Sequence, residues 1–511
     1  MAEAHAESIG PDKPKKRRRR AFEVRRDAAK FQRDLPLPDH QTNGDKEFFV
    51  NKIGSYSKAL PHNSLGEVDL AAYTALLAAL SSGDPNAFEA IPLGGSVKLA
   101  NPQAAYAFVL EGPDGHHLGT IPPPAFSSAE EASEMAELYW RALTRDVPFV
   151  NYSTDPLTQA AAVDLSQFSV FRGPKSVDVV TPDTLFRGNT PGDLIGPYIS
   201  QFLWKDIPYG AQTIVQRYRV PVKENDFMTS YADWLNIQRG VAPTAAITFD
   251  STTRYIGNGR DLGEYLHRDY SYQAFLNAAL ILLSLGAPAL DDANPYKTSA
   301  KQGGFTTFGG PSILDLVARV ALCALNAAWC QKWLVHRRLR PEAFGGRIHN
   351  HKIGAVSYPI SPEILHSPVL TAVFNKYGTY LLPQAYPEGC PTHPSYPGGH
   401  ATIAGACVTV LKAFFKESFV IPNPVVANTD GTALDPYVGP PLTVGGELNK
   451  LAANIGFGRD TAGLHWRSDE TEGLKLGEAV AIGVMTDLQE TYNENFAGFS
   501  LTKFDGTTTV V

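Results

Sequence analysis

The chain has 511 residues, 43% of them hydrophobic and 19% charged, and its net charge is −7 at pH 7. This length supports one large core or two to three domains, and the mildly acidic balance gives no sign of a nucleic-acid partner. We find no apolar run of about 18 residues to span a membrane, and no secretory leader, because charged residues follow the N-terminal arginines. The sequence therefore predicts a cytoplasmic protein without a membrane partner.

The N-terminal segment is polar and strongly basic. Positions 13–20 read KPKKRRRR, and a further arginine pair follows at 25–26. Such a block is compatible with a targeting signal or a nucleic-acid arm, but blocks of like charge are usually disordered and solvated. We expect residues 1–45 to form a disordered tail.

Two helices are predicted in the first third of the chain. DLAAYTALLAALSSGD at 69–84 reads as a helix that stops at Gly83. SSAEEASEMAELYWRALTRD at 127–146 begins with serines that each precede a glutamate by three positions, which is the capping-box pattern. Loops dominate from about residue 150, where the alternation in TIVQRYRVPV (213–222) predicts a short strand or hairpin arm.

Apolar helical patterns dominate the C-terminal half. Residues 311–340 read as one long helix, which Pro311 opens and Pro341 stops. Further helices are predicted at 272–287, 401–418, 447–460 and 472–496. We therefore expect a mainly α protein, divided after its tail into a loop-rich helical part (46–260) and a bundle (261–511) whose facing helices build a site.

The four cysteines are predicted to be free thiols. Cys323, Cys330, Cys390 and Cys407 form no CxxC pair, and three of them lie in apolar, helix-like sequence. Buried reduced thiols fit a cytosolic location.

Three polar clusters interrupt these apolar segments. Lys332 and Arg340 lie near the end of the long helix, PSYPGGH ends at His400 directly before an apolar run, and GRDTAGLHWRSD spans 458–469. Each cluster alone has an ordinary explanation: charges that complement a helix dipole, a glycine turn, or surface polarity. Their combination in one chain is much less expected by chance.

Together the three clusters have the chemistry of an oxyanion site. Lys332, Arg340 and Arg459 bring positive charge, and arginine suits bidentate binding of a tetrahedral oxyanion. The glycines before His400 allow a close approach to backbone N–H groups at a helix N-terminus, where the dipole favours anions. Asp469 lies four residues after His465 and is placed to orient a neighbouring histidine or arginine.

The order of these motifs resembles the vanadium-dependent haloperoxidases. The shared pattern is K-x₇-RP, then PSYxxGH, then GR-x₅-H-x₃-D, and the flanking text resembles the algal bromoperoxidase and streptomycete napyradiomycin-type branches, as in HRRLRPEAFGG at 336–346 and GELNKLAANIGFGRDTAGLHW at 446–466. The resemblance implies the fold that these enzymes share with type 2 acid phosphatases: two packed halves that each resemble a four-helix bundle, with few short strands.

The resemblance also implies vanadate as the cofactor. Lys332, Arg340 and Arg459 would neutralise its oxygens, the backbone of Gly399 would donate to another oxygen, and His465 would bind vanadium directly. Hydrogen peroxide and a halide would be the co-substrates, and the oxidised halide would halogenate an electron-rich aromatic or terpenoid small molecule.

The same resemblance assigns roles in catalysis or substrate binding to four residues. His400 would be the acid–base group beside the apical oxygen, Lys332 would polarise the bound peroxide, and His393 is a candidate proton shuttle. Trp329 stands where algal members carry an arginine beside the proposed halide site, which predicts a different halide preference or a stacked aromatic substrate. Relatives also imply a homodimer.

Gly398 is the main departure from the family pattern, which usually has serine there. The serine hydroxyl would donate to an equatorial oxygen of the anion, and losing such a donor costs about 1.5–3 kcal/mol. The loss fits a weakened haloperoxidase. It fits equally a family member that rearranges an α-hydroxyketone without halogenation and uses no vanadate, with His393 or His400 as the base.

A phosphatase is the third alternative. Phosphatases of this fold usually have six residues between the lysine and the arginine, whereas seven, 333–339, stand here. A pure scaffold would not require all five polar residues of the three clusters.

Overall fold

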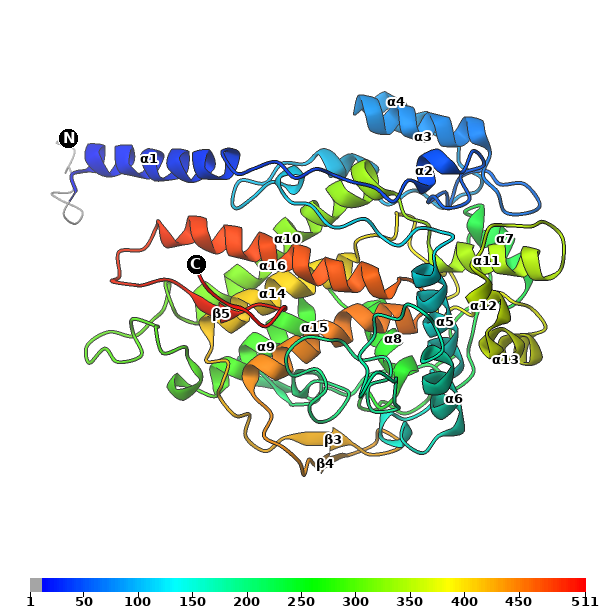
Figure 1. Cartoon of the computed structure of the whole chain (residues 1–511). Helices are drawn as coiled ribbons and strands as arrows, with labels where there is room; N and C mark the ends of the chain where they lie inside the picture. Colours follow the sequence, from blue (N-terminus) through cyan, green and yellow to red (C-terminus); the bar gives the residue numbers. More distant parts are fainter. Residues whose placement is uncertain (1–11) are drawn as a thin grey trace.

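The fold is mainly helical, as the sequence predicts. The computed structural model describes residues 12–511, and Figure 1 shows a body of packed helices with short strands at its edges. Within the described chain the strands form three antiparallel pairs: β1 (Ile207–Tyr209) with β2 (Gln212–Ile214), β3 (Val425–Ala427) with β4 (Leu434–Pro436), and β5 (Ser500–Thr502) with β6 (Thr508–Val510). Of the strand or hairpin arm predicted at 213–222, only residues 213 and 214 lie in one of these strands, β2, which is the second arm of the β1–β2 hairpin.

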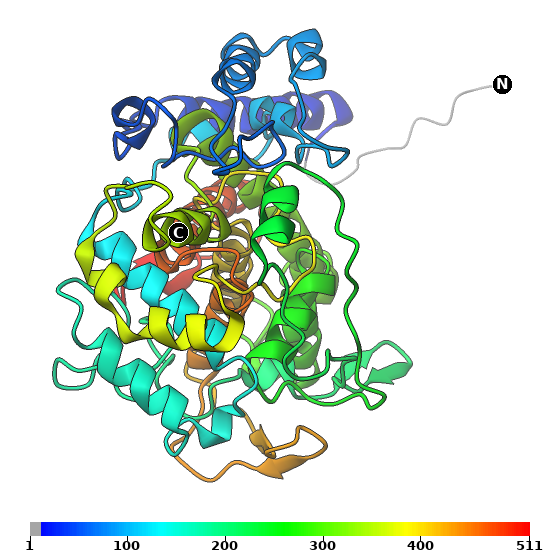
Figure 2. The ribbon, with the colours of Figure 1, turned by 90° about the vertical axis from the view of Figure 1, so that its right-hand side faces the viewer.

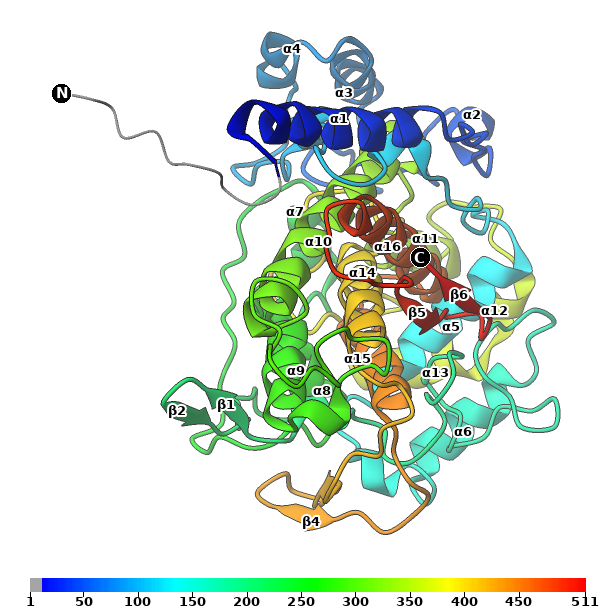
Figure 3. The ribbon, with the colours of Figure 1, turned by 90° about the vertical axis from the view of Figure 1, so that its left-hand side faces the viewer.

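A bundle of long helices forms the centre of the molecule. It consists of α8 (Gly259–Arg268), α9 (Gln273–Ser284), α10 (Gly310–Cys330), α14 (Gly399–Phe414), α15 (Val444–Thr461) and α16 (Arg467–Gln489). Figure 3 shows α14 surrounded by its neighbours, and α14 contacts α9, α10, α15 and α16. Helix α14 is mostly apolar and nearly all of its residues are buried, which fits this central position.

A second group of four helices packs against one side of this bundle. It consists of α5 (Ala129–Leu143), α6 (Pro156–Leu165), α12 (Pro362–His366) and α13 (Pro368–Tyr377). Figure 2 shows α5 in cyan beside the yellow-green helices. The side chain of Ser128 accepts from the N–H of Glu131, so the predicted helix at 127–146 begins at its expected cap.

The remaining helices lie around these two groups. They are α1 (Pro14–Arg33), α2 (Asp45–Phe48), α3 (Leu70–Ser82), α4 (Pro85–Glu89), α7 (Tyr231–Gln238) and α11 (Pro341–Lys352). Helix α3 ends at Gly83, which adopts the left-handed conformation expected of a C-terminal glycine.

The basic N-terminal segment is helical rather than disordered over residues 14–33. Pro14 occupies the first turn, Arg19 pairs with Glu23 one turn later, and the other residues are mostly good helix formers. Near its end Gln32 donates to the Asp487 carboxylate of α16 at 2.9 Å, which attaches α1 to the bundle. The part of the expected tail before residue 12 lies outside the described residues.

The predicted helix at 311–340 is two elements. Helix α10 continues as a π-helix over Gln331–His336, and Arg337 then takes a left-handed conformation with φ of 47°. The chain turns there, so Pro341 opens α11 instead of stopping α10, and Arg340 is the N-cap of α11. Lys332 and Arg340 consequently belong to different helices.

One helix is long and apolar enough to cross a membrane by length and composition, in contrast to the sequence expectation. It is the continuous stretch Gly310–His336, and half of its most apolar window is buried inside the protein. It packs against α9, α14 and α16 as a core helix does. The four cysteines are free in the described chain, as predicted.

Glycines allow α14 and α16 to pack at backbone distance. A Cβ built on Gly477 of α16 would lie 2.0 Å from the carbonyl oxygen of Thr402, and one on Gly405 of α14 would lie 2.1 Å from that of Leu474. Backbone atoms cannot move aside without separating the two helices, so the helix pair depends on these glycines.

We predict that Gly477→Ala destabilises the protein although alanine is the better helix former. Overpacking should cost about 2 kcal/mol or more of unfolding free energy, which exceeds the ~1 kcal/mol gained in propensity. Gly263→Ala in α8 is the matched control, because its Cβ would meet only Ala462 at 3.9 Å. Urea unfolding followed by circular dichroism measures both variants, and equal stabilities would contradict the prediction.

Candidate active site

The three polar clusters meet at one end of the central bundle. Lys332 comes from the π-helical extension of α10, Arg340 from the start of α11, Arg459 from the last turn of α15, and His465 from the loop before α16. The loop 391–398 closes the group and leads into α14. The candidate residues are therefore brought together from separate elements, as the sequence analysis expects.

Lys332 is fully buried against this loop. Its ammonium group donates to the carbonyl oxygens of Pro394 at 3.0 Å and Ser395 at 2.6 Å. Burial lowers the pKa of Lys332 well below its usual value, and the nearby Arg340 guanidinium lowers it further. A negatively charged ligand would oppose both effects.

The contacts of His465 define its tautomer. Arg340 donates through Nη1 to His465 Nε2 at 2.9 Å, and because arginine only donates, Nε2 carries a lone pair. The proton is therefore on Nδ1, which donates to the Asp469 carboxylate at 2.8 Å. This is the arrangement that prepares an imidazole nitrogen for a metal: one nitrogen is held by a carboxylate and the other is free of its proton.

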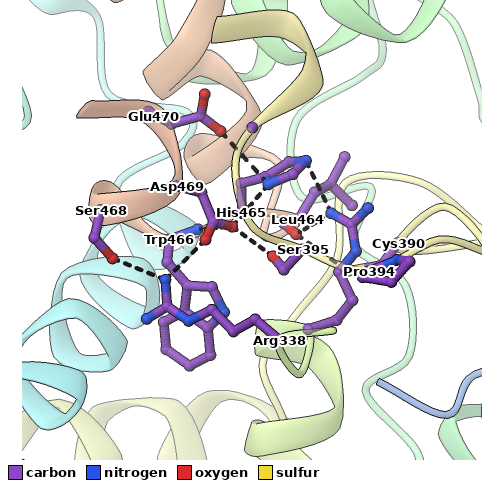
Figure 4. Close-up of polar contacts among 12 residues, drawn as sticks. Arg338, Cys390, Pro394, Ser395, Leu464, His465, Trp466, Ser468, Asp469 and Glu470 are labelled. Atoms are coloured by element: carbon purple, nitrogen blue, oxygen red, sulfur yellow. Dashed lines mark hydrogen bonds and ion pairs between the residues drawn. The ribbon is translucent and has the colours of Figure 1, made fainter. Parts of the chain in front are cut away.

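Asp469 connects the site histidine to three other segments (Figure 4). Its carboxylate accepts from Arg338 Nη1 at 2.7 Å, from the hydroxyl of Ser395, and from the backbone N–H of Trp466 at 3.2 Å, which is half of a capping box at the start of α16. Arg338 in turn pairs with glutamates of α5. Asp469 orients both a histidine and an arginine, whereas the sequence analysis left open which of the two it holds.

The N-terminus of α14 faces the same region. Helix α14 begins at Gly399, so the N–H groups of Gly399 and His400 belong to the first turn, which has no intrahelical acceptors. The N–H of Gly398, the N-cap, donates instead to the carbonyl oxygen of Asp469 at 2.8 Å. His400 is partly exposed and its Nε2 lies 3.1 Å from the Asp269 carboxylate.

His393 and Trp329 cover Arg340 from the outside. Arg340 donates through Nη2 to His393 Nδ1 at 3.0 Å, and the rings of His393 and Trp329 contact each other with centroids 4.7 Å apart. Trp329 donates to the carbonyl oxygen of Asn101 at 3.1 Å. These half-buried aromatic rings lie between Arg340 and the outside of the site.

The cations of the site surround His465. Burial is the main cause of the lowered pKa of His465, and the charges of Arg340, Lys332, Arg459 and His400 lower it further, in that order. Arg459 donates through Nη1 to the carbonyl oxygen of Leu266 at 2.8 Å, and its buried Nε has no partner among residues 12–511. This concentration of positive charge favours the binding of an anion.

The space beside Gly398 is occupied by Glu470, which the sequence analysis did not single out. A Cβ built on Gly398 would lie 2.5 Å from Glu470 Oε2. Burial raises the pKa of Glu470 well above its usual value, and the Asp460 and Asp469 carboxylates add to this effect. Glu470 directly follows Asp469 in the first turn of a helix, where a glutamate ordinarily only complements the dipole, so no sequence signal marks it.

The donor set fits a tetrahedral oxyanion. It offers an ammonium, two guanidinium groups, N–H groups of a helix N-terminus and one unprotonated imidazole nitrogen. The described residues contain no cluster of three or more His, Cys, Asp or Glu that would hold a metal cation. Asp269 and Arg338 complete the site from outside the three motifs, and nothing in the sequence links them to their partners His400 and Asp469.

The chain is similar to enzymes of known activity over nearly its whole length. It is 36% identical to a vanadium-dependent bromoperoxidase of Ascophyllum nodosum, over 98% of this chain and 95% of that protein. It is also 36% identical to the vanadium-dependent bromoperoxidase of Corallina officinalis, over 92% of both chains. The homohexameric structure of a second vanadate-dependent bromoperoxidase from Ascophyllum nodosum matches with a TM-score of 0.92 at 31% identity, covering 99% of this chain and 93% of that one. Residues 365–494 match the family model described as the VCPO second helical-bundle domain.

We predict that Asp469→Asn weakens anion binding about 10- to 100-fold, as expected when the carboxylate that orients a ligand histidine is lost. It should also lower the stability by ~3 kcal/mol, because Arg338 loses a buried partner. Equilibrium dialysis with phosphate and thermal unfolding measure the two effects. Asp315→Asn, which removes an exposed carboxylate paired with Arg319, is the control and should leave both unchanged. An unaltered phosphate affinity in Asp469→Asn would contradict the assignment.

Proposed function

Because the chain belongs to the vanadium-dependent haloperoxidase family, we propose that it holds vanadate in the buried basic pocket and uses hydrogen peroxide to oxidise a halide. The oxidised halide then halogenates an electron-rich organic molecule. The observation that carries this proposal is the environment of His465, whose unprotonated Nε2 lies among the charges of Lys332, Arg340 and Arg459. Such a site has both a ligand nitrogen for vanadium and cations for its oxygens.

The roles of the binding residues follow from their chemistry. Lys332, Arg340 and Arg459 neutralise the oxygens of the anion, and the N–H groups of Gly399 and His400 donate to it from the start of α14. His465 is the metal ligand through Nε2. Arg340 Nη1 lies 2.9 Å from that nitrogen, so the guanidinium has to release Nε2 and donate to an oxygen of the anion instead.

Proton transfer is assigned to residues at the edge of the pocket. Bound vanadate supplies a Lewis-acidic centre that activates peroxide without a change of oxidation state. His400, partly exposed and held by Asp269, exchanges protons between the pocket and solvent. Lys332 would polarise the peroxide through its ammonium group, and His393, against Arg340 and Trp329, would be the second proton carrier.

We propose bromide as the halide. The similar enzymes are named bromoperoxidases, and bromide is easier to oxidise than chloride. Trp329 brings no positive charge to the pocket wall, and its ring offers a stacking surface to an aromatic or terpenoid substrate of the meroterpenoid or naphthoquinone type. The substrate is therefore assigned to the side of the pocket that His393 and Trp329 form.

A rearrangement of an α-hydroxyketone without halogenation is the second candidate. The observation that favours it is Glu470, because its carboxyl group fills the space beside the start of α14 where a serine hydroxyl at position 398 would bind the anion. In this case His393 or His400 removes a proton and Lys332 polarises the carbonyl, with no vanadate bound.

Vanadium retention combined with a bromination assay separates these candidates. We expect the protein to keep stoichiometric vanadium after incubation with orthovanadate and dialysis, and to brominate monochlorodimedone only when peroxide and bromide are both present. His465→Ala should lose the vanadium and the activity, because the metal has no other nitrogen ligand. The control is His116→Ala, which alters a partly exposed histidine paired with Asp114.

The opposite result identifies the alternative. A folded protein that keeps no vanadium and does not brominate refutes the haloperoxidase proposal, and turnover of an α-hydroxyketone by that protein would establish the rearrangement.

The assembly is also a prediction: sedimentation velocity separates the homodimer expected from the sequence from a hexamer like that of the similar structure. The cytoplasmic location likewise stays a prediction.

A further inference from the structure

Glu470 occupies the volume into which a side chain at position 398 would project. A Cβ on Gly398 would lie 2.5 Å from Glu470 Oε2, 2.8 Å from its Cδ and 2.9 Å from its Oε1. These separations are shorter than real Cβ contacts, so a serine at 398 and the observed position of Glu470 exclude each other. With glycine at position 398, the polar group in this space is the carboxyl group of Glu470 and not a serine hydroxyl.

A second glycine completes the space for this carboxyl group. A Cβ on Gly456 of α15 would lie 3.2 Å from Glu470 Oε2, which is tighter than an ordinary contact. Glu470 is therefore held between the N-cap of α14 and the middle of α15, with its own backbone in the first turn of α16. Its location is fixed by three helices rather than by a flexible loop.

The carboxyl group lacks a hydrogen-bonding partner within the described chain. Glu470 is fully buried, and neither of its oxygens is hydrogen-bonded to any residue in 12–511. The nearest basic nitrogen is His465 Nδ1 at 3.7 Å, whose proton is already donated to Asp469 (Figure 4). Buried polar groups without a partner are rare, and a bound water, ion or ligand is a common source of the missing bond.

We infer that Glu470 takes over the role of the absent serine: its carboxyl group is the side chain that hydrogen-bonds an oxygen of the bound oxyanion next to the N-terminus of α14. This inference rests on the proposed function, because it assumes that an oxyanion binds between His465 and α14. A bond between a carboxyl group and an anion oxygen contains one proton, as the serine's bond does. Glu470 is therefore a binding residue for the anion and not only a filler of the core.

Four matched variants test the exchange, with orthovanadate and phosphate as the probes in calorimetry and equilibrium dialysis. Glu470→Ala should bind both anions about 10- to 100-fold more weakly, because it removes one charge-assisted hydrogen bond. Glu470→Gln keeps the shape and an N–H donor and should stay within about threefold of the wild type. Gly398→Ser with Glu470→Ala moves the hydroxyl into the vacated space and should recover most of the lost affinity.

Gly398→Ser alone is expected to lose affinity, because the new side chain meets the carboxyl group. Glu472→Ala is the control. This buried glutamate follows Glu470 by two residues in α16 and pairs with Lys475 at 2.7 Å instead of lying against Gly398. Thermal unfolding confirms that each variant is folded, and Glu470→Ala should fold at least as stably as the wild type since it removes an unpaired buried carboxyl group.

The outcomes separate this inference from the proposed function. Unchanged or tighter binding in Glu470→Ala overturns the inference, and so does a loss in Glu470→Gln as large as in Glu470→Ala. A wild type that binds neither vanadate nor phosphate overturns the proposed function itself. Weak binding in Glu470→Ala that the second substitution, Gly398→Ser, restores supports the exchange.

Discussion

The buried carboxylate of Asp469 is the interaction on which the site depends. Its two oxygens accept from His465, Arg338, Ser395 and the backbone of Trp466, and its carbonyl oxygen accepts from Gly398. One residue therefore fixes the tautomer of the histidine, the start of α16, the loop before α14 and, through Arg338, helix α5. A carboxylate with this many donors is satisfied although it is fully buried. The positions of the site residues are consequently set by hydrogen bonds at the N-termini of the helices, and not by mobile side chains.

The buried cations of the site repel one another, and binding an anion would offset this repulsion. Lys332 and Arg340 are buried with pKa values lowered by desolvation, and Arg459 has a buried Nε without a partner among the described residues. Like charges held together in the interior oppose folding, and an anion among them adds an attractive interaction with each cation. The same arrangement thus lowers the stability of the empty protein and raises its affinity for an oxyanion, which is the usual relation between a functional site and stability.

The sequence predicts those parts of the fold that local patterns determine. Apolar periodicity locates the central helices, and Ser128 and Gly83 mark helix ends correctly because caps act through near neighbours. The end of the helix between Lys332 and Arg340 is not predictable in this way. The apolar pattern continues to Leu339, and the proline at 341 is compatible both with the end of one helix and with the start of the next. Helix α1 also differs from expectation, because helix propensity outweighs charge repulsion over residues 14–33. The site residues were predictable from motif order, but their partners Asp269 and Arg338 depend on tertiary contacts.

Gly398 illustrates how a one-dimensional pattern misjudges a substitution. Along the sequence, a glycine at a position where the family pattern predicts serine suggests the loss of a hydrogen-bond donor, with a penalty of about 1.5–3 kcal/mol. In three dimensions the position is not vacant, because a carboxyl group from a residue 72 positions later fills it. Whether the pocket is weakened therefore depends on the pair formed by Gly398 and Glu470, and the effect of either residue is defined only when the other is specified. A site assembled from the starts of several helices allows such exchanges, since a side chain on one helix reaches the space that its neighbour leaves empty.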